Sequence, residues 1–77
     1  MDAQWSTDAV RSLLELARQD QRQAERVADA IRQYERNGTG NVRALQGSPR
    51  RLRLRVGDWR VILAVEGNRI LVDEVVL

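Results

Sequence analysis

The chain has 77 residues and a net charge of +2, with 43% apolar and 31% charged residues, which is the balance of one small globular domain spanning residues 1–77. It has no cysteine and no histidine, which excludes disulfides, thiol nucleophiles, imidazole bases and the usual zinc ligands, and we expect no metal or cofactor. No stretch approaches the roughly 20 apolar residues of a membrane span and no signal peptide is evident, so we expect a cytoplasmic protein without a membrane partner.

The chain opens with a segment, residues 2–6, that is compatible with a short edge strand. Ser6 or Thr7 then suits the N-cap of a helix, because a short hydroxyl side chain can accept a hydrogen bond from the first free backbone N–H groups. Apolar residues at helical spacing follow this cap. They predict a first helix over about residues 7–18.

A second helix is predicted over about residues 22–36, after the polar run 18–23, which has no apolar residue and marks a connection or a turn. Its apolar stripe, which we expect to be core, is formed by Ala24, Val27, Ala28, Ile31 and Tyr34. Asn37-Gly38 should end the helix, because both residues tolerate left-handed backbone geometry. Residues 37–49 then predict a linker, with Gly47-Ser48-Pro49 as a breaker.

Three antiparallel strands are predicted over about residues 50–56, 59–66 and 69–77. Gly57-Asp58 and Gly67-Asn68 separate them as two-residue hairpin turns, and Gly in the first position is typical of a type II′ turn. These turns fix the register. The pairs expected across them are Val56 and Trp59, Arg55 and Arg60, Leu54 and Val61, Glu66 and Arg69, and Val65 and Ile70.

The register divides the sheet into two faces, since side chains alternate along a strand. The predicted core face holds Leu52, Leu54, Val56, Trp59, Val61, Leu63, Val65, Ile70, Val72 and Val76. The opposite face holds Arg51, Arg53, Arg55, Arg60, Ile62, Ala64, Leu71, Asp73 and Val75. Glu74 falls on the core face and interrupts it. The fold class is therefore α+β, with two N-terminal helices packed on one side of a small twisted antiparallel sheet and a basic face on the other.

The arginines of that basic face are concentrated in one segment. Residues 1–36 carry six arginines and seven acids, whereas residues 43–60 carry six arginines and the single acid Asp58. Like charges that face each other across strands destabilise a hairpin, so this arrangement predicts a polyanionic partner. Two alternatives stay open: a protein partner, or a solvated face with extended arginine side chains. Asp73 is expected to be a structural counter-ion to Arg53 or Arg60, and both tryptophans, Trp5 and Trp59, are expected to be core anchors.

The order of elements and three sequence stretches resemble the RelE/ParE superfamily of toxins from type II toxin–antitoxin systems. The stretches are residues 41–47, Asn-Val-Arg-Ala-Leu-Gln-Gly; residues 51–62, Arg-Leu-Arg-Leu-Arg-Val-Gly-Asp-Trp-Arg-Val-Ile; and residues 70–76, Ile-Leu-Val-Asp-Glu-Val-Val. The hairpin is the most specific of them. Trp59 stands where the family commonly has tyrosine.

This resemblance implies a ribosome-dependent endoribonuclease that cuts mRNA in the ribosomal A site and so inhibits translation. Matched by position, the catalytic residues would be Arg51, Arg53 and Arg60, which would stabilise charge on the scissile phosphate. Arg43, Arg50 and Arg55 would bind RNA. The implied partners are a cognate antitoxin, the ribosome and mRNA.

Two other functions stay open, because mRNA-cleaving members usually continue past the last strand with a further arginine and a tyrosine or histidine, whereas this sequence stops at Leu77. One is a ParE-type inhibitor that poisons DNA gyrase by binding. The other is an inactive relative that only binds an antitoxin. The expected free edges at residues 2–6 and 69–77 would allow a homodimer, and a hetero-oligomer with the antitoxin is equally compatible with the sequence.

Overall fold

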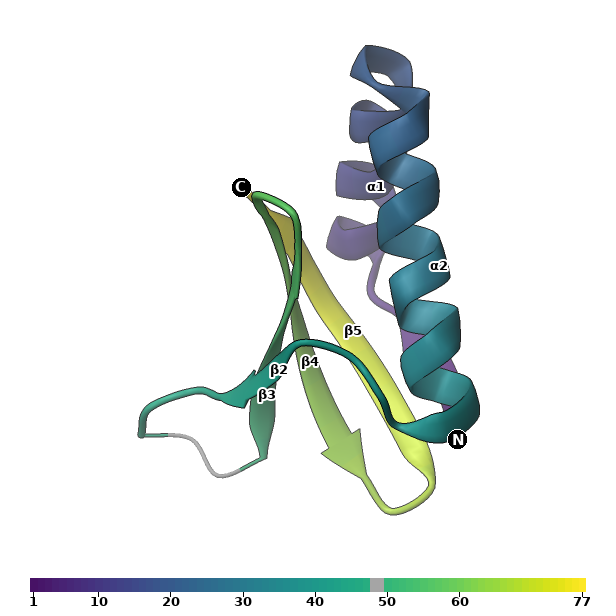
Figure 1. Ribbon diagram of the computed structural model, residues 1–77. Helices are drawn as coiled ribbons and strands as arrows, with labels where there is room; N and C mark the ends of the chain where they lie inside the picture. The colour runs from purple at the N-terminus through teal and green to yellow at the C-terminus, as the bar shows by residue number, and fades with distance from the viewer. Residues whose placement is uncertain (48–49) are drawn as a thin grey trace.

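The computed structural model describes residues 1–47 and 50–77, and it places two helices on one face of a five-stranded sheet (Figure 1). The elements are β1 Asp2–Trp5, α1 Thr7–Gln19, α2 Gln21–Asn37, β2 Val42–Ala44, β3 Arg51–Val56, β4 Trp59–Glu66 and β5 Arg69–Val76. The sheet order is β1-β5-β4-β3-β2. The predicted α+β layers are confirmed, but the sheet is mixed, because β1 runs parallel to β5.

A single residue, Asp20, separates the two helices and serves both. Its backbone N–H donates to the Leu16 carbonyl at 2.7 Å and so closes α1. Its carboxylate accepts a hydrogen bond from the Gln23 N–H at 3.1 Å and so opens α2. The predicted connection is therefore present but shorter than the polar run suggested. Gly38, with a φ of 70°, ends α2 in the left-handed conformation expected there. Neither described helix combines the length and apolar character needed to span a membrane.

Both predicted hairpins form, and each turns at a glycine with positive φ. Gly57 has a φ of 61° and Gly67 a φ of 58°, while no other residue type in the described chain has positive φ. Positive φ at the first central position alone is the property of the type II′ turn. The residues paired across the turns are as predicted, namely Val56 and Trp59, Arg55 and Arg60, Leu54 and Val61, Glu66 and Arg69, and Val65 and Ile70.

Two short strands extend the three that the sequence predicts. β1 pairs with the first half of β5, from Asp2 opposite Arg69 to Trp5 opposite Val72, so the two edges expected to be open cover each other. β2 pairs antiparallel with β3. The prediction of a linker without a strand over residues 37–49 is therefore wrong, because the outer backbone groups of β3 need partners and β2 supplies them. The predicted breaker Gly47-Ser48-Pro49 extends outside the described residues.

A β-bulge interrupts the pairing of β5 with β4. Leu63 lies opposite Val72, but its neighbour Ile62 lies opposite Glu74, which leaves Asp73 as an extra residue on β5. An extra residue reverses the alternation of side chains beyond it. The second half of β5 is therefore turned over relative to the regular register that the sequence suggests.

This bulge corrects three predicted side-chain positions. Val75, expected on the basic face, is buried in the core opposite Val61. Val76, expected in the core, pairs with Arg60 on the opposite face. Glu74, which interrupted the predicted core, is exposed, so no carboxylate is buried there.

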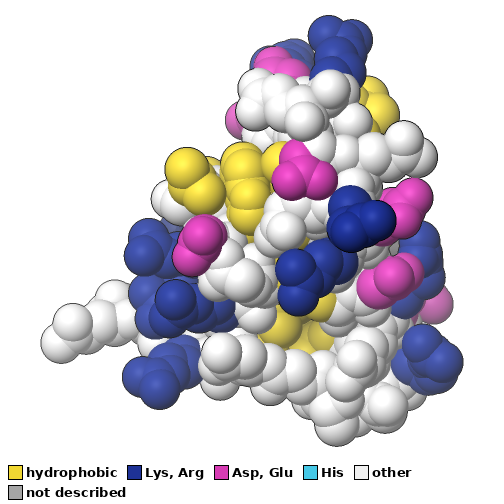
Figure 2. Space-filling view, turned by 45° about the horizontal axis from the view of Figure 1, so that its top comes forward, with side chains coloured by type: hydrophobic (Ala, Val, Ile, Leu, Met, Phe, Trp, Pro, Cys, Tyr) yellow, Lys and Arg dark blue, Asp and Glu magenta, His cyan; other side chains and the backbone are white. Residues whose placement is uncertain are grey.

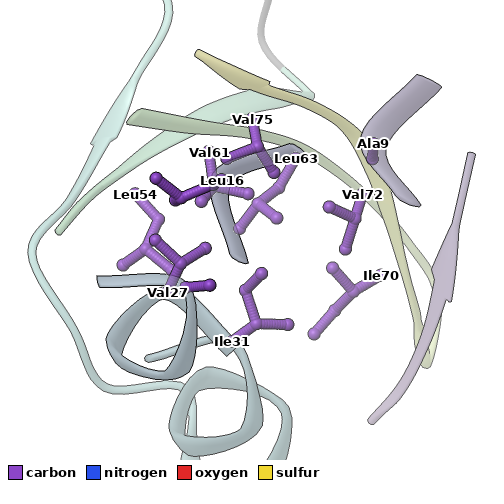
Figure 3. Packing of buried hydrophobic residues seen from close by; sticks show 11 residues of the cluster. Ala9, Leu16, Val27, Ile31, Leu54, Val61, Leu63, Ile70, Val72 and Val75 are labelled. Atoms are coloured by element: carbon purple, nitrogen blue, oxygen red, sulfur yellow. The ribbon is translucent and has the colours of Figure 1, made fainter. Parts of the chain in front are cut away.

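The core lies between the helices and the apolar face of the sheet (Figure 3). The helices contribute small and branched side chains, and the three central strands contribute the rest. Its buried members are Ala9, Leu16, Ala24, Val27, Ile31, Leu54, Val61, Leu63, Ile70, Val72 and Val75. Trp5, Tyr34 and Trp59 pack against this cluster while partly buried, as expected for core anchors.

The core predicts a sharp contrast between two leucines. Leu63→Ala should lower the free energy of unfolding by about 2–5 kcal/mol, because the side chain is fully buried and its removal leaves a cavity. Leu14→Ala removes the same atoms from a side chain that is 57% exposed, and should change stability by about 0.5 kcal/mol or less. Urea unfolding followed by circular dichroism measures both. Equal effects would contradict the assigned core.

Candidate nucleic-acid interface

The sheet surface that faces away from the helices carries five arginines, which we call the arginine face. They are Arg43 on β2, Arg51, Arg53 and Arg55 on β3, and Arg60 on β4. Their positions follow from the period-two alternation of β3, which turns Leu52, Leu54 and Val56 to the core and the arginines outward. In the space-filling view, basic side chains gather at the sheet side of the molecule, whereas basic and acidic side chains are interspersed elsewhere (Figure 2).

Strand pairing sets these arginines directly opposite one another. Arg43 faces Arg53 across β2 and β3, and Arg55 faces Arg60 across β3 and β4. Residues that face each other in an antiparallel pair have Cα atoms about 4.5–5.5 Å apart. Repulsion between the charges of arginines paired in this way opposes folding and favours an anion that lies between them.

A small hollow opens where β2 meets β3. Its volume is about 130 Å³, and it is lined by Asn41, Arg43, Arg53 and Arg55. The Asn41 carbonyl accepts the Arg55 backbone N–H at 2.9 Å, which continues the pairing of the two strands past Val42. The Arg55 Nε donates to the Gly57 carbonyl at 3.0 Å and so holds this side chain against its own hairpin. Of the predicted site residues, the structure thus brings Arg43, Arg53 and Arg55 together.

Arg51 lies toward the other end of β3 and has a carboxylate partner. Its Nη2 is 3.6 Å from an Asp73 carboxylate oxygen, and the two side chains are 43% and 39% exposed. The expectation that Asp73 pairs with Arg53 or Arg60 is therefore wrong, although its part as a counter-ion is confirmed. A pair this exposed contributes about 1 kcal/mol or less. The Arg51 Nε is buried without a hydrogen-bond partner, so this guanidinium is only partly satisfied.

The remaining predicted residues lie at the two ends of the first hairpin. Arg60 is exposed on β4 opposite Arg55. Arg50 is exposed in the turn that precedes β3, and its carbonyl accepts the Val65 N–H at 3.3 Å. Arg50 does not line the hollow. Within residues 1–47 and 50–77, Arg51–Asp73 is the one ion pair that involves the arginine face.

The bulge in β5 brings two consecutive acids to this face and is held by a residue far away in sequence. The Ser6 hydroxyl donates to the Asp73 carbonyl at 2.7 Å and accepts from the Ala9 N–H at 3.0 Å. Ser6, and not Thr7, is therefore the N-cap of α1. The same hydroxyl fixes a helix end and the strand position from which Asp73 reaches Arg51.

Two residues of this surface were missed by sequence reasoning, Asn41 and Glu74. Asn41 lies at the site only because β2 pairs with β3, and the three residues of β2 show no pattern that predicts a strand. The sequence does contain one signal for the position of Glu74. A regular register places its carboxylate in the core, where it would be unpaired. An acid at a predicted core position of a strand indicates a bulge.

The arginine face offers guanidinium, amide and carboxylate groups and little else. Tyr34 lies on α2 and packs against the core, so it is on the helical side of the sheet. The described residues hold no group of three or more acidic, histidine or cysteine side chains that could bind a metal ion. The chemistry available at this face is therefore the binding of anions, the stabilisation of negative charge and, at the exposed carboxylate of Glu74, proton transfer.

Two helices packed on the apolar face of a small sheet, with arginines on the opposite face, are features of a type II toxin. The chain belongs to the family described as "ParE toxin of type II toxin-antitoxin system, parDE", whose model matches residues 3–76. It is thus a toxin of a type II toxin–antitoxin system, and the predicted resemblance to the RelE/ParE superfamily is confirmed. No curated protein sequence matches the chain.

Solved structures share the fold at low sequence identity. The YoeB/ParE toxin from Agrobacterium tumefaciens is 24% identical and superposes with a TM-score of 0.83 over 100% of this chain and 98% of its own. The heterotetrameric YoeB-YefM toxin-antitoxin complex from Staphylococcus aureus contains a chain that is 16% identical, with a TM-score of 0.81 and coverage of 100% and 95%. The RelB-RelE antitoxin-toxin complex from Methanococcus jannaschii contains a chain that is 18% identical, with a TM-score of 0.77 over 94% of this chain and 86% of its own.

The double role of Ser6 is testable by three substitutions. Ser6→Ala removes the cap acceptor and the donor to the bulge, and should lower the free energy of unfolding by about 1–3 kcal/mol. Ser6→Thr keeps both hydrogen bonds and should be nearly neutral. Ser6→Asp keeps the cap but cannot donate, so its stability should be intermediate. Urea unfolding measures the series, and an Asp variant as stable as the wild type would contradict a role in the bulge.

Proposed function

We propose that this toxin is a ribosome-dependent endoribonuclease that cleaves mRNA and so inhibits translation. The observation that carries the proposal is the arginine face itself. Arg43, Arg53, Arg55 and Arg60 are crowded across three strands, and among the described residues none of the four has a carboxylate within ion-pair distance. Positive charge held together at a cost in folding energy suits the RNA backbone.

The reaction suited to this surface is attack by a ribose 2′-hydroxyl on the adjacent phosphate. The new 2′-O–P bond forms while the P–O5′ bond breaks, giving a 2′,3′-cyclic phosphate and a 5′-hydroxyl. Negative charge builds on the phosphorane and on the leaving oxygen. Arg53 and Arg60 would stabilise this charge, and Arg51, with its partly satisfied guanidinium, would assist from the far end of β3. The paired strands hold the backbone positions of Arg53 and Arg60 as the charge develops.

A proton acceptor is also needed, and Glu74 is the residue that fits this role. The chain has no histidine, and Asp73 is already paired with Arg51. Glu74 is exposed and lies opposite Ile62, which in turn lies opposite Arg53, so one uncharged residue separates the acid from the arginine. Its carboxylate would take the 2′-hydroxyl proton, and the departing 5′-oxygen would receive a proton from the same acid or from water.

An antitoxin would keep the toxin inert. The Staphylococcus aureus and Methanococcus jannaschii neighbours are toxin–antitoxin complexes, as their names state. For this chain we propose a cognate antitoxin that lays an acidic segment over the arginine face, since that surface carries one ion pair among the described residues and otherwise unneutralised charge. A complex whose affinity is insensitive both to salt and to Arg53→Glu would rule out this mode of binding.

A second candidate function is inhibition of DNA gyrase by binding, without cleavage of RNA. One ground for it is the family description, ParE toxin of the parDE system. The other is that the described part of the arginine face has neither histidine nor tyrosine. Gyrase-linked DNA breaks in the absence of RNA cuts would favour this function.

Primer extension on a reporter mRNA in a reconstituted translation reaction tests the nuclease proposal. We expect cuts within A-site codons that require ribosomes. Arg60→Ala should slow cleavage about 10²–10³-fold, by analogy with the removal of one oxyanion donor. Arg26→Ala, an equal change of charge at an exposed position of α2, serves as the control and should cleave normally. Absence of cuts by the wild type would contradict the proposal.

The role of Glu74 predicts a loss of rate without a loss of fold. Glu74→Gln should slow single-turnover cleavage about 10²–10⁴-fold, because general bases typically contribute that much. Glu66→Gln, at an exposed acid beside the second turn, is the matched control and should retain the full rate. Cleavage by Glu74→Gln at the wild-type rate would exclude Glu74 as the base and leave the arginines in place.

A further inference from the structure

The hollow at the β2 edge of the arginine face has the composition of an anion site. It is lined by one asparagine and three arginines, namely Asn41, Arg43, Arg53 and Arg55. We propose that this hollow binds a single phosphate group of a nucleic-acid backbone and so anchors the strand beside the reacting bond. The inference deepens the proposed function, and it rests on that function only for the identity of the strand as RNA.

The hollow is held open by backbone pairing and not by its own charged side chains. Arg43 and Arg53 are set opposite each other by β2 and β3, and the Arg55 N–H is bonded to the Asn41 carbonyl at 2.9 Å. The Arg55 Nε bond to Gly57 fixes the direction of that side chain and leaves its two terminal nitrogen atoms free to donate elsewhere. Strand pairing therefore fixes the backbone positions from which the arginines reach an anion, and the Arg55 side chain is also held in direction, which lowers its entropic cost of binding.

The size and chemistry of the hollow favour phosphate over a nucleobase or a carboxylate. A volume of about 130 Å³ holds several water molecules and thus one tetrahedral phosphate. No lining side chain is aromatic, so a base would find no ring on which to stack. Three arginines line the hollow, which is more guanidinium groups than the two oxygens of one carboxylate can engage, whereas a phosphate accepts on several oxygens at once.

Nuclear magnetic resonance of the arginine Nε–Hε groups tests the site in the whole chain without ribosomes. Titration with inorganic phosphate should shift the signals of Arg43, Arg53 and Arg55 saturably. A uridine trinucleotide should shift the same three signals at a concentration at least tenfold lower, which would distinguish a backbone phosphodiester from free phosphate. Arg43→Ala should weaken both effects at least tenfold.

Two further variants guard against a trivial loss of binding. Asn41→Asp keeps the backbone carbonyl that pairs with Arg55 but places a carboxylate in the hollow, so it should abolish phosphate binding while the amide spectrum stays folded. Arg26→Ala removes an arginine from α2 and should leave binding unchanged.

Three results would overturn the inference. Equal, non-saturating shifts of all arginine signals would indicate an adventitious ion only. Saturation by a hexaglutamate peptide but not by phosphate or the trinucleotide would assign the hollow to an acidic protein segment. Unchanged binding in both Arg43→Ala and Asn41→Asp would place the phosphate elsewhere. Because the assay involves no cleavage, a phosphate-binding hollow in a chain that cuts no RNA would leave this inference standing while the nuclease proposal fell.

Discussion

The alternation of arginine and aliphatic residues along β3 is the constraint on which both sides of this protein depend. One strand places Leu54 in the core and turns Arg53 and Arg55 outward. The register of β3 therefore positions both the core and the arginine face. A slip by one residue would bury the guanidinium groups and expose the aliphatic side chains. The hydrophobic burial that stabilises the fold therefore also holds the like charges together, and no separate device is needed to assemble the surface.

The second half of β5 shows how a local irregularity joins the helical layer to that surface. Ser6 caps α1 and also holds the Asp73 carbonyl, at the bulge where β5 changes its alternation. Because of the bulge, Val75 completes the core while Asp73 and Glu74 lie on the side of the arginines. Positive charge and two carboxylates thus occur on one surface. The proposed cleavage would use the arginines for charge stabilisation and a carboxylate for proton transfer.

The hairpins, the two helices and the register of β3 with β4 could be predicted from the sequence, because each depends on nearby residues: a glycine turn, a capping side chain or a regular apolar period. The features that could not be predicted depend on distant contacts. Pairing of β2 with β3 brings Arg43 and Asn41 to Arg53. The three residues of β2 are too few to show the alternating pattern that predicts a strand. Asp73 was expected beside Arg53 or Arg60 and pairs with Arg51, since the bulge shifts β5 relative to the other strands.

The salt dependence of RNA binding is the measurement that tests the central claim most directly, namely that the arginine face holds RNA phosphates. Four arginines of this face, Arg43, Arg53, Arg55 and Arg60, have no carboxylate partner among the described residues. For single-stranded RNA, each neutralised phosphate contributes about 0.7 to the slope of log affinity against log salt, so the account predicts a slope of about −3. Arg53→Glu should bring this slope clearly closer to zero, because it removes one arginine that contacts a phosphate and adds a negative charge. A slope near zero, or one that Arg53→Glu leaves unchanged, would contradict the account.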